Sequence, residues 1–377
     1  MIKDYMAIIN LDENENDIRS LTTNRPIASI PLGSRYRVID FMLSNIVNCG
    51  IQNVGIFSGT NSRSLTDHVG TGKAWDLNRK IDGLFVFNHG LCDFVNHDSK
   101  LLKNNMEYIY RSHSDNVIFA SSYMVCNMDL ADVVQAHEAS GADMTVVYKS
   151  TDEADSEFLN CYTLDIDENT NRLLGVGKNI GFSKDANICM EIFLMKKEKL
   201  VELIYKSAHN LESKSFISFI FNEMVNLNVN TYKYDGIVLC INTISSYYRS
   251  NMKMLTPEVS DKLFRSDRPI YTKIKDEPPT LYVKGCEVKN SLIADGCIIK
   301  GKVKNSVIGR YVDIEDDVEI EDCIILQNIR IHKGAKLSHV IIDKNVDIEE
   351  GTELKGNETF PLVIEKKNLF KYFLLLA

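Results

Sequence analysis

Aliphatic residues recur along the last third of the chain at steps of six, six and five positions, so that the pattern repeats every 17 residues. A helix would bury residues three and four apart, so the pattern predicts short strands instead. Steps of about six are typical of a hexapeptide left-handed β-helix, in which three short strands form one triangular coil and stacked coils bury a continuous column. The series is Ile308, Ile314, Ile320, Ile325, Ile331, Leu337, Ile342, Ile348 and Leu354.

The repeat extends upstream of Ile308. Cys297 and Val303 continue the 17-residue spacing toward Ile314 and Ile320, which predicts about four coils from near residue 288 to near residue 354. Such solenoids leave open coil ends that suit assembly between subunits. An acyltransferase that uses a histidine of the β-helix, His332 or His339, as general base is the alternative. Solvated surface histidines are the simpler interpretation, and an acyltransferase would leave the long preceding segment unexplained.

The first two thirds of the chain alternate short apolar runs with helical patterns, which predicts βαβ units around a mixed, mostly parallel sheet. Strands are expected at 6–10, 54–57, 117–120 and 144–148, with helices ahead of Gly50 and from Asp129 to Gly141. The resulting prediction is an α/β, Rossmann-like domain over residues 1–245, a linker over 246–284 that starts near a helix at 245–254, and a β-helix domain over 285–377.

Composition narrows the possible partners and the compartment. The formal net charge of -9 argues against nucleic acid and anionic membranes as partners, because both recruit basic surfaces. No apolar stretch near either end has the length of a membrane span or the form of a signal peptide. The nine cysteines are scattered without a CxxC pair, which favours a reducing compartment and disfavours a zinc site. We therefore expect a cytoplasmic protein.

One segment is similar to a known family. Residues 21–45 read Leu-Thr-Thr-Asn-Arg-Pro-Ile-Ala-Ser-Ile-Pro-Leu-Gly-Ser-Arg-Tyr-Arg-Val-Ile-Asp-Phe-Met-Leu-Ser-Asn. This resembles the pattern L-T-x-x-R-A-K-P-A-V-x-F-G-G-x-Y-R-I-I-D-F-x-L-S-N of bacterial ADP-glucose pyrophosphorylases. Further matches lie at 48–51, 68–75, 243–252 and 341–344. The resemblance covers nearly the whole chain and implies a sugar-1-phosphate nucleotidyltransferase fold followed by a β-helix.

The loop after the first strand departs from this family. Active members carry a loop like G-G-x-G-x-R-L there, whose glycines let backbone N–H groups approach the phosphates of the nucleotide. Residues 11–18 here are Leu-Asp-Glu-Asn-Glu-Asn-Asp-Ile, with no glycine, and Asp17 stands where the arginine would be. Like charges about 4 Å apart repel by on the order of 1 kcal/mol in water and by more when partly desolvated. The loop is therefore not a phosphate cradle.

Both metal-binding aspartates of the family are also replaced. The resemblance places Tyr123 at the first position and Cys240 at the second. A neutral phenol is a poor ligand for Mg²⁺, and a thiol is too soft for it. The family's sugar-phosphate motif E-K-P is reduced to Gly177-Lys178-Asn179, in which Lys178 could still bind a sugar phosphate or be a surface lysine. We therefore expect no catalytic residue and no metal ligand in this chain.

The resemblance points to the non-catalytic, regulatory (GlgD-type) subunits of the family. It implies a hetero-oligomer, expected to be a tetramer, with a catalytic ADP-glucose pyrophosphorylase subunit that alone binds Mg²⁺, so no cofactor is expected here. Arg25 and Arg37 fall where the family binds small anionic effectors, with Arg35 between them, and Ile27 replaces the family's effector lysine. Surface ion pairs with Asp or Glu are the alternative role for Arg35 and Arg37.

Two other functions are compatible with the sequence. The chain could be a weakly active sugar-1-phosphate nucleotidyltransferase in its own right, which would require Mg²⁺-dependent ATP binding. It could instead be a sugar-phosphate or glucan binding module that uses Lys178 and Trp75.

Overall fold

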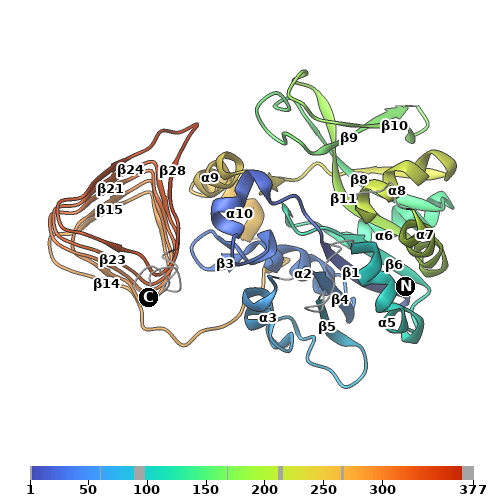
Figure 1. The fold of residues 1–377 in the computed structure, drawn as a ribbon, viewed down its shortest axis with the longest axis horizontal. Coiled ribbons are helices and arrows are strands. Elements are labelled where there is room, and N and C mark those ends of the chain that lie inside the picture. Colours follow the sequence, from blue (N-terminus) through green and yellow to red (C-terminus); the bar gives the residue numbers. More distant parts are fainter. Residues whose placement is uncertain are drawn as a thin grey trace, which may run out of the picture.

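The computed structural model describes residues 2–59, 61–88, 98–167, 169–210, 215–264 and 267–366. The chain forms an α/β domain followed by a parallel β-helix that stands beside it (Figure 1). The β-helix was predicted to run to residue 377, and its last residues, 367–377, lie outside the described residues. Within the described part, no helix is both long enough and apolar enough to cross a membrane.

The α/β domain is built on a nine-stranded mixed sheet with the order β5-β4-β1-β6-β11-β8-β12-β10-β9. Strands β5, β4, β1 and β6 are parallel, and β11 runs antiparallel to β6. The four strands expected from sequence are β1, β4, β6 and β8. The bounds are β1 (Tyr5–Leu11), β4 (Asn53–Ser58), β5 (Gly83–Asn88), β6 (Asn116–Ala120), β8 (Met144–Thr151), β9 (Tyr162–Asp167), β10 (Arg172–Lys178), β11 (Ala186–Lys196) and β12 (Val229–Lys233).

Helices cover both faces of this sheet (Figure 1). Alternate residues of β1 enter opposite cores: Ala7 and Ile9 pack with α2 and α6, whereas Met6 and Ile8 pack with α4, α5, α7 and α8. Asp129 caps α6 as expected, because its carboxylate accepts the N–H of Ala131. The bounds are α1 (Arg19–Thr22), α2 (Val38–Asn48), α3 (Arg63–Val69), α4 (Asp98–Asn104), α5 (Met106–Arg111), α6 (Leu130–Ser140), α7 (Lys197–His209), α8 (Phe216–Glu223), α9 (Ile244–Lys253) and α10 (Pro257–Phe264).

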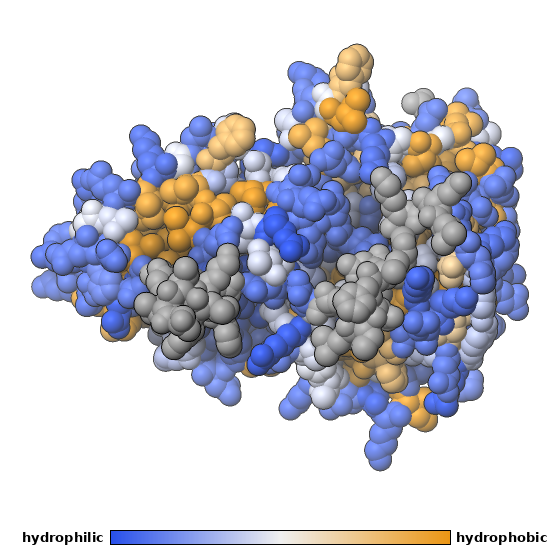
Figure 2. Space-filling model, viewed as in Figure 1, coloured by the Kyte–Doolittle hydropathy of each residue, from blue (hydrophilic) through white to orange (hydrophobic). Residues whose placement is uncertain are grey.

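The C-terminal part is the predicted left-handed β-helix, with three parallel sheets of five strands each. The faces are β14 (Leu281–Tyr282), β17 (Ile298–Ile299), β20 (Val312–Ile314), β23 (Ile329–Ile331) and β26 (Asp347–Ile348); β15 (Glu287–Lys289), β18 (Lys302–Lys304), β21 (Glu319–Glu321), β24 (Lys336–Ser338) and β27 (Glu353–Lys355); and β16 (Leu292–Ile293), β19 (Val307–Ile308), β22 (Ile324–Ile325), β25 (Val340–Ile342) and β28 (Leu362–Ile364). The predicted aliphatic series fills its core. In Figure 2, apolar side chains gather at one end of it, as expected for an open coil end.

The upstream extension of the repeat was partly wrong. Val303 stacks on Ile320 as predicted, but the partner of Ile314 is Ile299 rather than Cys297. The spacing is therefore 15 residues over one coil, because a shorter corner precedes Val303, whereas the first pair, Leu281 with Ile298, keeps the spacing of 17. Its first strand, β14, lies just upstream of residue 285.

The third face of the β-helix packs on the α/β domain. Ile324, Leu326 and Ile341 share a core with Tyr247 and Tyr248 of α9. The Tyr248 hydroxyl also donates to the carbonyl oxygen of Asp322, at 2.8 Å. Helix α9 therefore belongs to the junction between the two parts of the chain, where it joins them through buried contacts.

Candidate functional site

The loop after β1 lies at the carboxyl end of the parallel strands, where open α/β sheets bind their ligands. Glu13 of this loop turns inward and accepts hydrogen bonds from the Ser122 backbone N–H at 2.6 Å and from the Ser122 hydroxyl at 2.7 Å. Burial raises the pKa of Glu13 to about 8, and the hydrogen bonds from Ser122 oppose that shift. The loop therefore fills the end of the sheet with a carboxyl group, where the family's active members bind phosphates.

Asp12 of the same loop is exposed at the surface, but its carboxyl group lies beside that of Asp98. Partial desolvation of this carboxyl group and the neighbouring Asp98 together raise its pKa to about 8. Asp98 is held in place by the side chain of Asn10 at 2.9 Å and by the backbone N–H of Phe216 at 2.9 Å. Asp17 is also exposed and accepts a hydrogen bond from Asn160 at 3.2 Å. The carboxylate of Asp17 would repel a triphosphate at this position.

The two positions of the family's metal-binding aspartates come together as the resemblance implies. Strands β7 (Met124–Val125) and β13 (Leu239–Cys240) pair antiparallel, and the Ile241 N–H donates to the Tyr123 carbonyl at 3.0 Å. The Tyr123 hydroxyl donates to Glu191 Oε1 at 2.6 Å. The Cys240 sulfur lies 3.6 Å from the Cys161 sulfur. A phenol, two thiols and one carboxyl group therefore occupy the centre of the site.

This set of groups does not fit Mg²⁺. The ion requires hard oxygen ligands, usually with carboxylates among them. Burial raises the pKa of Glu191 to about 7, with the Tyr123 hydrogen bond as the largest opposing effect. Burial and the charge of Glu191 raise the pKa of Tyr123 far above its usual value, so the phenol stays neutral. Among the described residues no cluster of three or more His, Cys, Asp or Glu has a metal-binding arrangement.

Glu191 is a residue of this site that sequence reasoning missed. It lies in the middle of β11 with φ of +51°, at an irregularity in the pairing of β11 with β8 between Cys189 and Phe193. The irregularity turns the glutamate side chain toward Tyr123 instead of into the apolar core. Nothing in an apolar strand pattern predicts such a bulge, because the bulge depends on pairing with a strand distant in sequence.

Lys178 lies at the rim of the same site. It ends β10, is exposed, and its ammonium lies 5.1 Å from the centre of the Tyr162 ring. Its charge is close enough to lower the pKa of Glu191, although burial dominates that pKa. The next residue, Asn179, is buried and donates to backbone carbonyls of the preceding loop, at 2.8 Å to Ala154. The loop conformation therefore presents Lys178 to solvent beside the substituted site.

The three arginines predicted to bind an anion have different surroundings. Arg25 is buried and forms an ion pair of 2.8 Å with Asp343 of the β-helix. Arg37 donates to the Ser64 carbonyl at 2.8 Å, and burial lowers its pKa to about 10. Arg35 is exposed and lies over the ring of Tyr36. Arg25 and Arg37 line a common cleft, and Arg35 is not part of its lining.

The cleft lies between the α/β domain and the β-helix and has a volume of about 620 Å³. Besides Arg25 and Arg37, three cations that the site prediction did not include line it: Arg63, Lys344 and Lys366. Burial, with the charges of Arg25 and Arg37, lowers the pKa of Lys344 to about 8. Three acidic side chains also line the cleft, against five basic ones, so the excess of positive charge favours an anion.

The structure also shows the surroundings of two other sequence candidates. Trp75 is only 2% exposed and packs edge-on to His68, so it offers no surface to a sugar. This part of the glucan-module prediction was wrong, because the tryptophan fills the core beside α2. On the β-helix, His332 lies between Glu315 at 3.2 Å and Asp347 at 3.0 Å. It is a partly solvated ion-pair residue on a regular face of the solenoid.

Comparison with known proteins identifies the two halves. Residues 17–159 match the nucleotidyl transferase family model, and residues 280–359 match the GlmU-like, C-terminal hexapeptide model. The first match begins at residue 17, which follows most of the acidic loop. The order of the two matches is the order of the two parts of the structure.

Similarity to curated proteins extends over almost the full chain. The glycogen biosynthesis protein GlgD of Bacillus subtilis (strain 168) is 32% identical over 96% of this chain and 95% of its own length. The protein of the same name from Geobacillus stearothermophilus is 35% identical over 82% of this chain and 80% of its own length. The glucose-1-phosphate adenylyltransferase of Bacillus thuringiensis (strain Al Hakam) is 27% identical over 92% of this chain and 93% of its own length. The chain therefore belongs to the GlgD-type relatives of ADP-glucose pyrophosphorylase and is a glycogen-related, nucleotidyltransferase-like protein.

Proposed function

We propose that this chain is a regulatory, catalytically deficient subunit of glucose-1-phosphate adenylyltransferase. That enzyme converts ATP and glucose 1-phosphate into ADP-glucose and pyrophosphate. In this proposal the chain contributes no catalytic residue and no metal ligand, and it acts in the cytoplasm by modulating a catalytic homologue.

The observation that carries the proposal is the hydrogen bond between Tyr123 and Glu191 at the position of the family's metal site. A Mg²⁺–triphosphate complex needs carboxylates for the ion and backbone N–H groups or cations for the phosphates. Here the phenol of Tyr123, the thiol of Cys240 and the carboxyl groups of the 12–17 loop occupy these places. Phosphate binding and metal binding are thus disfavoured by separate changes.

The proposed partner is a catalytic ADP-glucose pyrophosphorylase subunit, with the two chains in a heterotetramer. The chain keeps the two-part scaffold, and its relatives include both GlgD proteins and glucose-1-phosphate adenylyltransferases. A scaffold that persists without the metal-binding residues is expected where assembly and control are the retained roles. Only the catalytic partner would bind Mg²⁺.

The cleft between the two domains is the proposed site for a small anionic effector. Arg25, Arg37 and Lys344 converge there from both parts of the chain. An anion that binds to these groups would contact both domains at once. Its binding energy would therefore depend on how the two domains are arranged, which is what an effector requires.

Two measurements test the proposal directly. Gel filtration of this chain mixed with its catalytic homologue should give a complex larger than either chain alone. Titration of the isolated chain with ATP and Mg²⁺ should give no binding heat at millimolar nucleotide. Two unshifted peaks in the first measurement, or saturable Mg²⁺-dependent binding in the second, would contradict the proposal.

A further inference from the structure

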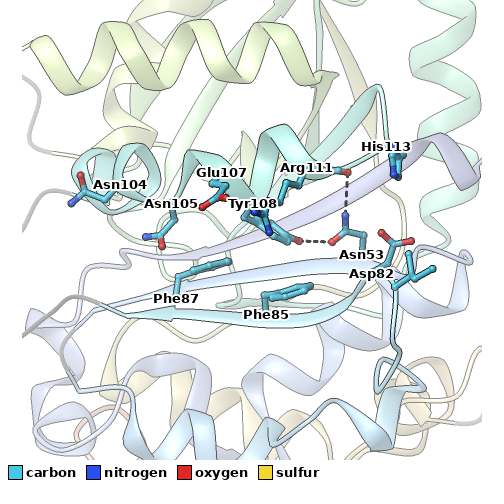
Figure 3. Close-up of a pocket in the computed structure, with 12 residues that line it drawn as sticks. Asn53, Asp82, Phe85, Phe87, Asn104, Asn105, Glu107, Tyr108, Arg111 and His113 are labelled. Carbon is cyan, nitrogen blue, oxygen red and sulfur yellow. Dashed lines mark hydrogen bonds and ion pairs between the residues drawn. The ribbon is translucent and has the colours of Figure 1, made fainter.

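A cleft of about 370 Å³ lies on the side of the α/β domain, between the edge strand β5 and helix α5 (Figure 3). Its size is within the range of small-molecule sites. None of its lining residues lines the anion cleft or belongs to the Tyr123–Glu191 site. Its floor and back wall are aromatic, and its rim is polar.

Three aromatic rings shape the interior. Phe85 and Phe87 are two residues apart on β5, so both project from the same face, and their ring planes differ by only 12° with centres 6.4 Å apart. Tyr108 of α5 lies at 5.2 Å from one ring and 5.0 Å from the other. Figure 3 shows the two phenylalanine rings side by side along the strand, beneath the helix. Phe85 is 44% exposed, which is unusual for a phenylalanine in a sheet.

Tyr108 is held rigidly. Its hydroxyl donates to Asn53 Oδ1 at 2.7 Å, and the Asn53 amide donates to the Ser112 hydroxyl at 3.1 Å. Gly55 makes room for the ring, because a Cβ there would lie 2.6 Å from the nearest Tyr108 carbon. The wall is therefore fixed before any ligand arrives, which lowers the entropy cost of binding.

The rim of the cleft selects against anions. Asp82 and Glu107 contribute two carboxylates, and the guanidinium of Arg111 is paired with Glu107 at 2.6 Å. A nucleotide or sugar phosphate would meet net negative charge here. Asn104 adds an exposed amide that can donate and accept hydrogen bonds. The chemistry suits an uncharged ligand with an apolar face and hydroxyl groups at its edge.

We propose that this aromatic cleft binds a chain of α-linked glucose units, with the C–H faces of the sugars stacked on Phe85 and Phe87. The electron-rich faces of aromatic rings attract such C–H groups, and the hydroxyls at the sugar edge reach the amide and the charged rim. The choice of glucose rests on the proposed role in glycogen synthesis. Binding here would hold the complex on the polymer that its product extends.

Native electrophoresis in gels that contain glycogen tests the proposal. The chain should be retarded by glycogen but not by dextran, whose glucose units are linked differently. Isothermal titration with maltoheptaose should show the same interaction in solution. Phe85→Ala should weaken the affinity for glycogen in the gel and for maltoheptaose in solution at least tenfold. Asn104→Ala should weaken both affinities several-fold. Phe182→Ala removes a phenylalanine that is 94% exposed elsewhere and should change neither.

The thermal unfolding midpoint of each variant reports whether it is folded. Because Phe85 is half exposed, its removal should leave that midpoint close to that of the parent chain. No retardation of the parent chain by glycogen would overturn the proposal, as would equal retardation of the folded Phe85→Ala variant. The experiment contains neither nucleotide nor partner, so its failure would leave the regulatory role untouched, and failure of the regulatory role would leave this result standing.

Discussion

The hydroxyl of Tyr123 donates a hydrogen bond of 2.6 Å to the carboxyl group of Glu191 in the buried centre of the nucleotidyltransferase fold. Both side chains are less than 10% exposed, at 7% each. This pair satisfies, within the protein, a buried polar site where the family's active members hold an ion. The substitution therefore changes the site from one that recruits a ligand to one that is complete without it.

Removing the Tyr123 hydroxyl should destabilise the folded protein. Tyr123→Phe leaves Glu191 buried without its hydrogen-bond donor, and we expect the free energy of unfolding to fall by about 1–3 kcal/mol, measured by urea denaturation. Tyr110→Phe is the matched control, because its hydroxyl makes a 3.4 Å contact with Tyr205 at the surface. Equal changes in the free energy of unfolding for the two variants would show that the Tyr123–Glu191 hydrogen bond does not stabilise the protein.

The buried glutamates predict how stability depends on pH. Burial raises the pKa of Glu13 to about 8 and of Glu191 to about 7, above the value of about 4.3 for an unfolded glutamate. At a pH between the unfolded and the native pKa of each group, the native state keeps a proton that the unfolded state has released. The free energy of unfolding therefore falls as pH rises from about 5 to 8, by up to about 1.4 kcal/mol per pH unit for each group.

Glu13→Gln isolates this effect from other titrating groups. His68, whose pKa is lowered by burial, acts in the opposite direction near pH 6, because the unfolded state binds the proton there. The difference between the two chains cancels such contributions. We expect the stability of the Gln variant, measured from pH 5.5 to 7.5, to decline less steeply than that of the parent chain. Parallel curves would contradict the assignment of a raised pKa to Glu13.

The contact between Arg25 and Asp343 should be a main link between the two parts of the chain. Their side chains are 3% and 6% exposed. Asp343→Asn leaves a buried guanidinium without its counter-charge, which typically costs roughly 3–5 kcal/mol of folding free energy. Glu319→Gln removes one partner of the pair with Lys302, whose side chains are 52% and 59% exposed, and should cost about 0–1 kcal/mol. Similar urea midpoints for both variants would refute the buried link.

The anion cleft predicts a specific role for Lys344. Inorganic phosphate should raise the thermal unfolding midpoint of the parent chain, and Lys344→Ala should lose most of that rise. Lys336→Ala, on an exposed face of the β-helix, is the control and should keep it. Because the pKa of Lys344 is lowered to about 8, phosphate binding should weaken as pH rises through 8. An undiminished phosphate effect in Lys344→Ala would exclude this lysine from the site.

Local patterns predicted the architecture well because each element buries a periodic set of side chains. The 17-residue repeat identified the β-helix, and Ile308, Ile325 and Ile342 stack in register. The error at Cys297 arose at one coil that is two residues shorter than the others. A change in corner length alters the register without altering the aliphatic character of the sequence.

The sites were less predictable because they are made by pairs that are distant in the chain. The substitutions at Tyr123 and Cys240 could be found only through the resemblance to a known family. Glu191 reaches Tyr123 through a bulge, and Lys344 of the β-helix lines the anion cleft only because the two domains pack together. Sequence patterns describe single elements, whereas these contacts depend on how the elements pack.

The measurement that tests the central claim most directly is ADP-glucose synthesis by three preparations: this chain alone, its catalytic homologue alone, and the co-expressed pair. The account predicts no activity above background for this chain alone. It also predicts a changed substrate affinity or turnover for the pair relative to the homologue. Substantial Mg²⁺-dependent synthesis by this chain alone would contradict it, because some other carboxylates would then have to hold the ion in place of Tyr123 and Cys240.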